Sequence, residues 1–232
     1  MSELVKDTLA HDVVAEITSG MIVGLGTGRT AARGIRALAQ RVKDEGLEIR
    51  CVPTSEASET LAKELGLEVT DFAMVEAVDF LFDGADEVDR HLNLMKGGGG
   101  AMTRERIVAW ASKRCVYMVT EDKFVDRLGT NNTLAIAVLA FGLASIRAAL
   151  REYGLNGVCR RSINGDLFIT DNGNLILDVG LPETMDLNEI WAALNDHPGV
   201  IDHGLFLYEA DEIVVEHGDG SIERLTRPDP AG

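Results

Sequence analysis

The chain has 232 residues, of which 46% are hydrophobic and 26% charged, and its formal net charge is −16. This length suits one large domain or two small ones, and the apolar fraction is enough for a packed core. No apolar run reaches the ~18 residues that a membrane span requires, and the charged, amphipathic start lacks the form of a signal peptide. We therefore expect a cytoplasmic protein. Because an acidic chain repels nucleic acid and anionic membranes at long range, we expect it to bind neither.

The basic residues are 6 Lys and 16 Arg. Excess acid with few lysines fits either adaptation to high salt or simply an acidic protein from a GC-rich genome. Cys51, Cys115 and Cys159 are odd in number, far apart and set in apolar or strand-like stretches. We therefore expect buried or half-buried thiols, with no disulfide framework and no metal-binding cysteine pair.

Strands and helices alternate over residues 1–130. The periodicity predicts a helix at 3–18, a strand at 21–25, a helix at 30–45, a strand at 49–53, a helix at 55–65, strands at 69–72 and 78–83, a helix at 102–112 and a strand at 116–120. This alternation predicts a Rossmann-like α/β domain, with a mostly parallel sheet and helices on both faces.

Residues 131–207 follow a different order, predicted as a strand at 134–140, a helix at 143–153, strands at 158–163, 167–170 and 175–178, a helix at 186–196 and a strand at 200–207. Asn172-Gly173 is a strong hairpin signal. This order approximates βαββαβ, which predicts a smaller ferredoxin-like α+β domain. We expect 208–226, with a strand at 212–216, to complete the first domain, and 227–232 to be a disordered tail.

The loop Gly24-Leu25-Gly26-Thr27-Gly28-Arg29-Thr30 joins a buried strand to a helix. Glycines let backbone N–H groups close around an anion, and the helix N-terminus adds a favourable dipole. The loop is not a P-loop, and Arg29 breaks the dinucleotide fingerprint. The loop predicts a phosphate site; the alternative is a tight turn that merely needs glycine.

Asp83-Gly84-Ala85-Asp86-Glu87-Val88-Asp89 places four carboxylates at the end of an apolar strand. It is not an EF-hand loop. A Mg²⁺ site is one interpretation, but Lys96 competes for the same carboxylates. A solvated acidic turn is the other interpretation. Ligands of parallel sheets bind outside the carboxyl ends of the strands, which favours a site.

Lys96 precedes four consecutive glycines, Gly97 to Gly100. Such a run is costly in backbone entropy, so a flexible linker or a close approach to a ligand would explain it. Glu105 lies in the first turn of the next helix, where the dipole favours a carboxylate. It is a candidate general base, or an ordinary helix-start glutamate. The scattered histidines form no catalytic triad pattern.

In this order, the segments resemble ribose-5-phosphate isomerase of the A type. The resemblance covers nearly the whole chain and rests on GLGTGRTA (24–31), TSEAS (54–58), DGADEVD (83–89), KGGGGA (96–101), TRERI (103–107), TDNGNLILD (170–178), PGV (198–200) and GLF (204–206). The order and spacing of these motifs are far more specific than any motif alone.

The resemblance implies an aldose–ketose isomerase that needs no metal or other cofactor and interconverts the sugar phosphates D-ribose 5-phosphate and D-ribulose 5-phosphate through an enediolate. It implies that Glu105 transfers the proton, that Asp83 and Asp86 bind sugar hydroxyls, and that Lys96 stabilises negative charge on oxygen. The implied substrate-binding residues are Lys6, Thr27, Gly28, Arg29, Thr30, Asp83, Gly84, Ala85, Asp86, Lys96, Gly97, Gly98, Gly99 and Lys123. A homodimer is also implied.

Two segments depart from the family pattern. Arg29 stands where the family usually has Ser, and could either add a bidentate phosphate contact or point outward. Residues 128–140 lack the usual proline-rich segment. Two other classes stay open: a sugar-phosphate sensor, and another enzyme of related fold, such as an amino-sugar-phosphate deaminase or a CoA transferase.

Overall fold

The computed structural model describes residues 7–227, and the chain forms two compact units. Of the described residues, unit 1 contains 7–85, 104–123 and 209–227, and unit 2 contains 86–103 and 124–208. Lys6 and the predicted tail from residue 228 onward lie outside the described residues.

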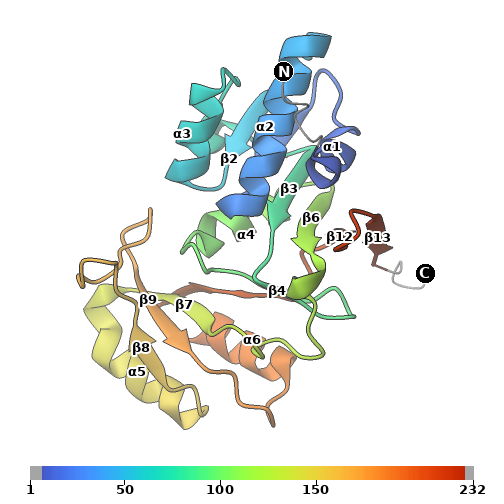
Figure 1. The fold of residues 1–232 in the computed structure, drawn as a ribbon. Coiled ribbons are helices and arrows are strands. Elements are labelled where there is room, and N and C mark those ends of the chain that lie inside the picture. The colour runs from blue at the N-terminus through green and yellow to red at the C-terminus, as the bar shows by residue number, and fades with distance from the viewer. Residues whose placement is uncertain (1–6, 228–232) are drawn as a thin grey trace. The chain divides into compact units, whose positions relative to one another are not determined.

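Unit 1 is built on a six-stranded sheet in the order β13-β12-β6-β3-β1-β2 (Figure 1). All neighbours pair in parallel except β12 and β13, which form an antiparallel hairpin. Its strands are β1 (Ile22–Leu25), β2 (Arg50–Pro53), β3 (Phe80–Gly84), β6 (Cys115–Thr120), β12 (Glu212–Glu216) and β13 (Ile222–Thr226). Strands from near the beginning and near the end of the chain thus share one sheet. The mostly parallel topology confirms the predicted fold class.

Helices cover both faces of this sheet. A Cβ on Gly34 of α2 (Gly28–Glu45) would meet Phe82, whereas a Cβ on Gly24 would meet Leu81 and Val108 of α4 (Met102–Trp110). Because successive strand residues point to opposite faces, α2 and α4 lie on opposite sides of β3. The other helices of unit 1 are α1 (Thr8–Val14), α3 (Glu56–Glu64) and the 3₁₀ turns η1 (Phe72–Met74) and η2 (Glu121–Lys123).

Unit 2 contains the predicted βαββαβ arrangement. Its four-stranded antiparallel sheet has the order β10-β7-β9-β8, which is the ferredoxin-like order and confirms that prediction. The elements are β7 (Leu134–Val138), η3 (Ala140–Gly142), α5 (Leu143–Glu152), β8 (Gly157–Cys159), β9 (Leu175–Val179), α6 (Leu187–Asp196) and β10 (Val200–His203). Apolar residues of α5 and α6, such as Leu150 and Ile190, share one buried core with β7 and β9.

A three-stranded sheet in unit 2 was not expected. It joins β4 (Glu87–Val88), β5 (Leu94–Met95) and β11 (Leu205–Phe206) in the order β11-β5-β4. The strand β5 lies in the middle of this sheet and pairs with both β4 and β11. Residues 86–103 belong to unit 2, and so do residues 124–130. The compact units thus group these two segments with the residues that follow the expected boundary between residues 130 and 131.

Other predicted elements differ in detail. Residues 69–72 form no strand beyond a single bridge from Val69 to Cys51, and Asp71 instead caps η1. The strand at 200–207 is divided at Gly204 into β10 and β11. The first helix begins only at Thr8 and ends at Val14, so the described part of the 3–18 helix is shorter than predicted.

The predicted state of the cysteines is confirmed: Cys51 and Cys115 are buried and Cys159 is half-buried, all as free thiols. Burial, with nearby carboxylates adding to it, raises the pKa of the Cys51 and Cys115 thiols to about 12. Between residues 7 and 227, no helix has the length and apolar character needed to cross a membrane.

Asp7 fixes the start of α1 and offers a test of the packing in unit 1. Its carboxylate accepts the N–H of Ala10 as an N-cap and two bonds from Arg33 of α2, whose guanidinium also binds Glu216 of β12. Burial would raise the pKa of Asp7, but the hydrogen bonds from Arg33 and Ala10 outweigh it, so the pKa lies below the usual value of an aspartate. The stabilisation is therefore present above about pH 4 and lost at lower pH.

We predict that Asp7→Ala lowers the free energy of unfolding at pH 7 by about 1–3 kcal/mol, because the cap and the charged bonds are lost together. Urea titrations at pH 7 and pH 3 measure this, with Asp44→Ala at an exposed site on α2 as the control. The difference from wild type should shrink at pH 3. An equal difference at both pH values would contradict the assignment.

Candidate active site

The loop between β1 and α2 has the geometry of an anion site. Thr27 is the N-cap residue of α2, but its hydroxyl makes no capping bond and lies 2.7 Å from the hydroxyl of Thr54. Gly28 has a φ of +95°, a conformation that residues with side chains rarely adopt. The first N–H groups of α2 are therefore not capped by Thr27, as an anion site at a helix N-terminus requires.

Asp83, at the end of β3, is tied directly to this loop. Its Oδ1 accepts the N–H of Thr27 at 3.0 Å and that of Gly84 at 2.7 Å, and the residue is fully buried. A Cβ on Gly26 would lie 2.2 Å from the same Oδ1 and 2.5 Å from the Asp83 Cα. Glycine at position 26 is thus required by the close approach of β1 to β3.

The segment after β2 holds the loop between β1 and α2 through hydrogen bonds to its backbone carbonyls, a role that the sequence did not indicate. The Ser58 hydroxyl donates to the carbonyl of Gly26 at 2.6 Å, and the Thr54 hydroxyl donates to the carbonyl of Leu25 at 3.1 Å. Ser55 caps α3 by accepting the N–H of Ser58. The TSEAS motif therefore holds the backbone of the glycine loop.

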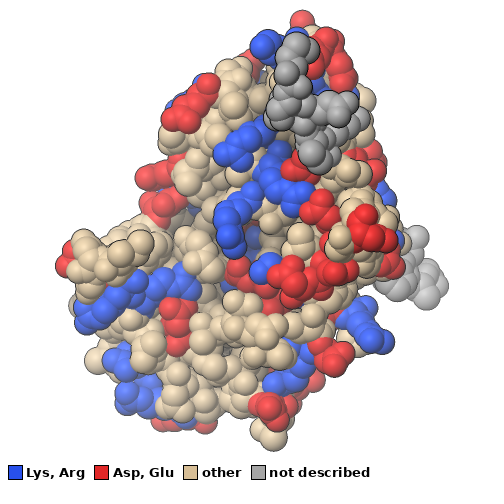
Figure 2. Space-filling model, viewed as in Figure 1, with Lys and Arg blue, Asp and Glu red and all other residues tan. Residues whose placement is uncertain are grey.

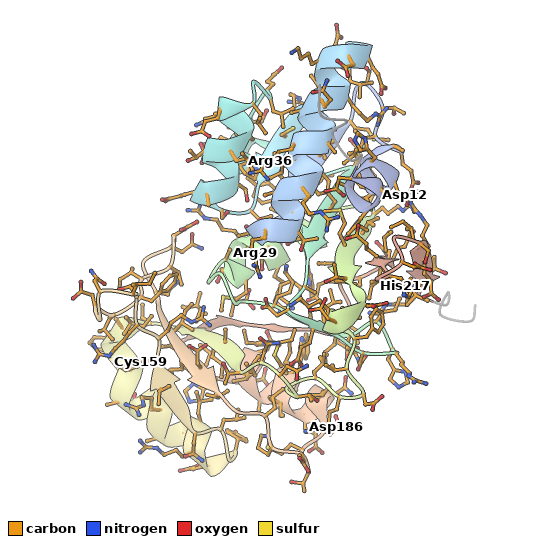
Figure 3. The ribbon with its side chains drawn as sticks, in the orientation of Figure 1. Asp12, Arg29, Arg36, Cys159, Asp186 and His217 are labelled. Atoms are coloured by element: carbon orange, nitrogen blue, oxygen red, sulfur yellow. The ribbon has the colours of Figure 1, made fainter. Side chains whose placement is uncertain are left out.

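Two cations of unit 1 follow strand ends. Arg29 is exposed in the first turn of α2, and Lys123 ends η2, directly after β6, where its Nζ lies 3.7 Å from an Asp122 oxygen. Figure 2 shows Lys and Arg side chains gathered over α2, and Figure 3 places Arg29 where α2 begins and Arg36 two turns further along. In a chain of charge −16, this helix supplies local positive charge.

Glu105 is held in the first turn of α4 and is only 5% exposed. Its neighbour Arg106 pairs with Glu209, which also accepts the indole N–H of Trp110 at 3.3 Å. The Glu209 side chain is almost fully buried, so these bonds anchor α4 at two successive turns. A buried carboxylate on an anchored helix is what a positioned proton acceptor needs.

Tyr117 was missed by the sequence analysis. It is fully buried on β6, directly opposite Asp83 in the register of β3 and β6. Burial, reinforced by the nearby Cys115 thiol and the carboxylates of Asp83, Glu209 and Glu105, raises its pKa well above the usual value. The phenol therefore stays protonated beside these carboxylates. The sheet register was the only signal that could have placed it there.

Lys96 in unit 2 is 4% exposed and is positioned by β11. Its N–H donates to the carbonyl of Gly204 at 2.9 Å, and a Cβ on Gly204 would lie 2.1 Å from the Lys96 carbonyl oxygen. The Lys96 ammonium lies over the ring of Phe206, 5.8 Å from its centroid, within the range of a cation–π contact. A buried ammonium next to an aromatic face is oriented as well as charged.

The acidic segment is not a solvated turn. Asp86 Oδ2 accepts the N–H of Gly98 at 2.8 Å, and buried Glu87 accepts the N–H groups of Gly129, Asn131 and Asn132. These carboxylates thus organise glycine-rich backbone. Among residues 7–227, no group of three or more His, Cys, Asp or Glu side chains is arranged to hold a metal ion.

The structure brings the candidate residues together in two groups. In unit 1, the carboxyl ends of β1, β3 and β6 carry Thr27, Asp83 and Lys123, and Thr30 lies beside Gly84. In unit 2, Asp86 contacts the glycine run after Lys96. Ala85 is the last residue of its segment of unit 1, and Lys6 lies outside the described residues.

Comparison with known proteins gives one consistent result. Residues 50–220 match the family model for ribose 5-phosphate isomerase A (phosphoriboisomerase A). The chain is 43% identical to ribose-5-phosphate isomerase A of Sphingopyxis alaskensis, over 92% of both chains, and 44% identical to that of Gluconobacter oxydans, over 93% and 94%.

Solved structures agree. A D-ribose-5-phosphate isomerase in complex with phospho-erythronic acid superposes with a TM-score of 0.90 at 35% identity, covering 95% of this chain and 97% of the other. Ribose 5-phosphate isomerase from Plasmodium falciparum gives 0.90 at 34% identity, covering 95% and 98%. These similarities extend over both units.

The approach of Gly26 to Asp83 can be tested directly. We predict that Gly26→Ala lowers the free energy of unfolding by about 1–3 kcal/mol, because the new methyl group collides with backbone as well as side chain. Gly180→Ala is the matched control, since nothing lies within 4 Å of a Cβ there. Thermal or urea unfolding measures both variants, and equal stability of the two would refute the steric argument.

Proposed function

Because the chain belongs to the ribose 5-phosphate isomerase A family, we propose that it interconverts D-ribose 5-phosphate and D-ribulose 5-phosphate. One observation carries this proposal: the family match includes Asp83, Lys96 and Glu105, and the structure holds all three as buried charged groups after strand ends or in a helix start. The neighbour solved with phospho-erythronic acid, a phosphorylated sugar acid, supports the substrate class.

The reaction moves one proton between adjacent carbons. A base removes the C2 proton of the open-chain aldose, the electron pair forms an enediolate, and the proton returns to C1 to give the ketose. We assign the base to Glu105, because its carboxylate is buried, sits in the first turn of α4 and is carried by a helix that Glu209 anchors. Each role below is likewise part of this proposal.

The enediolate carries negative charge on oxygen, which needs a preorganised cation or N–H donors. Lys96 fits this role, because its ammonium is buried and oriented by the ring of Phe206. In a low-dielectric site such a charge acts more strongly than in water. The N–H groups of Gly97 and Gly99 are the further donors that we assign to substrate oxygens, while the N–H of Gly98 donates to Asp86 and lets Gly98 position that carboxylate beside the substrate.

Asp83 and Asp86 are assigned to the sugar hydroxyls and to opening of the furanose ring, which transfers a proton from the C1 hydroxyl to the ring oxygen. Both carboxylates are fixed by backbone N–H groups, Asp83 by Thr27 and Gly84, and Asp86 by Gly98. Gly84 and Ala85 present backbone groups beside them. A carboxylate fixed in this way can exchange hydrogen bonds with a hydroxyl without reorienting.

The phosphate is assigned to the start of α2, where Thr27, Gly28, Arg29 and Thr30 present N–H groups and hydroxyls. The missing hydroxyl cap on α2 and the positive φ of Gly28 support this assignment. Lys6 and Lys123 are assigned to the substrate ends by the family resemblance. These contacts supply local positive charge that an acidic protein otherwise lacks.

We also propose that the enzyme works without a metal, in the cytoplasm and as a homodimer. Large apolar side chains of unit 2, among them Phe141 and Ile163, are fully exposed in the single chain, which supports burial against a second copy. Light scattering on the purified protein distinguishes the 25.1 kDa chain from its dimer.

The base assignment predicts that purified protein converts ribose 5-phosphate to a ketopentose phosphate in the presence of EDTA, and that Glu105→Gln lowers kcat by about 100- to 10,000-fold. Substrate binding should persist, because the amide keeps the size of the carboxylate. Glu189→Gln is the matched control, since Glu189 is an exposed glutamate in the first turn of α6. Full activity of Glu105→Gln would remove Glu105 from the mechanism.

Arg29 replaces the serine of the family pattern and is exposed at the start of α2. We predict that Arg29→Ser raises KM for ribose 5-phosphate by about 10-fold with little change in kcat, because a charge-assisted phosphate contact is lost equally from ground and transition states. Arg36→Ser, two turns along the same helix, serves as the control. An unchanged KM in Arg29→Ser would contradict a phosphate contact by the Arg29 side chain and would assign phosphate binding to the loop backbone alone.

A further inference from the structure

Arg160 lies directly after β8 in unit 2, outside every motif that pointed to catalysis. Its guanidinium makes a two-pronged contact with Asp178 of β9, with Nε to Oδ2 at 2.9 Å and Nη2 to Oδ1 at 2.5 Å. Its Nη1 donates to two backbone carbonyls, those of Gly97 at 2.8 Å and Gly98 at 3.0 Å. The guanidinium also lies over the ring of Phe168, 5.8 Å from its centroid.

These contacts leave the Arg160 side chain only 16% exposed. An arginine held by a carboxylate fork on one side and an aromatic ring on another is rigid. Its remaining N–H groups are therefore aimed at fixed points, the carbonyls of the glycine run. A lysine could not reproduce this set, because a single ammonium lacks the planar fork.

The peptide group that joins Gly97 to Gly98 is held at both ends. Its carbonyl accepts from Arg160, and its N–H donates to Oδ2 of Asp86 at 2.8 Å. Because a trans peptide is planar and its C=O and N–H point in opposite directions, fixing one end fixes the other. The Arg160 guanidinium and the Asp86 carboxylate are thus coupled through one rigid group.

The glycine run needs such an external restraint. Gly97 has a φ of +100° and Gly100 a φ of +79°, and unrestrained glycines lose more conformational freedom on ordering than any other residue. A residue with a side chain at position 98 would restrict the backbone, but it does not fit, since its Cβ would lie 2.8 Å from Asp86 Oδ1. The Arg160 bonds to two successive carbonyls set the directions of the Gly98 and Gly99 N–H groups.

We propose that Arg160 is a positioning residue for the isomerisation, which orients the Asp86 carboxylate and the Gly98 and Gly99 N–H groups through the carbonyls of Gly97 and Gly98. Asp178 in turn holds Arg160. The proposal rests on the proposed function, because it gives Asp86 and the glycine N–H groups their role toward substrate. It adds Arg160 and Asp178, which are distant in sequence, to the residues that position Asp86 and the glycine run.

The first test compares Arg160→Met with Arg161→Met. Arg161 is the adjacent, exposed arginine, whose Nη1 donates to the carbonyl of Gly165 in its own turn. We expect Arg160→Met to lower kcat/KM for ribose 5-phosphate by about 10- to 100-fold, as loss of groups that orient a functional side chain commonly does. Arg161→Met should leave it unchanged. Arg160→Lys should fall between wild type and Arg160→Met.

A double-mutant cycle with Asp86→Ala separates positioning from general structural damage. If Arg160 acts through Asp86, Arg160→Met lowers kcat/KM in the wild-type background and has little further effect in the Asp86→Ala background. An equal fold-loss in both backgrounds, or no loss in either, overturns the proposal. Should Arg160→Met fail to fold, the same cycle is run with Arg160→Lys and with Asp178→Asn.

Amide NMR gives a readout that does not depend on activity. In ¹⁵N-labelled protein, Arg160→Met should move the Gly98 and Gly99 amide resonances and speed their hydrogen exchange, whereas Arg161→Met should not. Unmoved resonances would overturn the coupling. If wild-type protein showed no isomerase activity, the proposed function would fail, while the NMR comparison would still decide whether Arg160 orients these N–H groups.

Discussion

The Asp83 carboxylate accepts hydrogen bonds from the backbone N–H groups of Thr27 and Gly84, and these two bonds are the constraint on which the rest of unit 1 depends. They lock the loop after β1 to the end of β3, and they require glycine at position 26 because the two strands come within contact distance there. With Thr27 drawn toward Asp83 and Thr54, its hydroxyl does not cap α2. One buried carboxylate therefore shapes both the strand ends and the phosphate-binding geometry that we propose.

Unit 2 repeats this arrangement with different elements. Asp86 accepts a glycine N–H as Asp83 does, and the carbonyl side of that glycine run is held by Arg160. Carboxylates in both units thus accept hydrogen bonds from backbone N–H groups. This explains how a protein of charge −16 can place several acids beside a proposed anionic substrate: the acids organise the backbone and are partly neutralised by it.

The sequence predicted an element correctly where the residues of that element alone determine its structure. The glycine loop, the helix after it and the hairpin at Asn172-Gly173 were predicted because local turn chemistry and periodicity suffice, and Gly173 has the positive φ that such a turn needs. The two-residue strands β4 and β5 were missed, because two residues show no periodicity. Of these two strands, β5 pairs with β11, which lies more than a hundred residues later in the chain, and β4 pairs with β5. Residues 86–103 accordingly belong to unit 2.

Contacts between distant segments account for the remaining differences. Arg160 reads as part of an ordinary strand, and only the fold shows that Gly97 and Gly98 lie within reach of its guanidinium. The predicted strand at 200–207 is divided at Gly204 into β10, which pairs with β7, and β11, which pairs with β5. The Lys96 carbonyl approaches Gly204 too closely for any side chain at that position. Tyr117 gave no sequence signal, since its closeness to Asp83 follows from the register of β3 and β6.

The central claim, proton transfer by a carboxylate through an enediolate, is tested most directly by isomerisation in D₂O. Ribose 5-phosphate is incubated with the purified protein and EDTA, and the products are followed by ¹H and ²H NMR. The account predicts solvent deuterium at C1 of ribulose 5-phosphate and, after reversal, at C2 of ribose 5-phosphate. Complete conversion with no deuterium at either carbon would indicate direct hydride transfer and would contradict it.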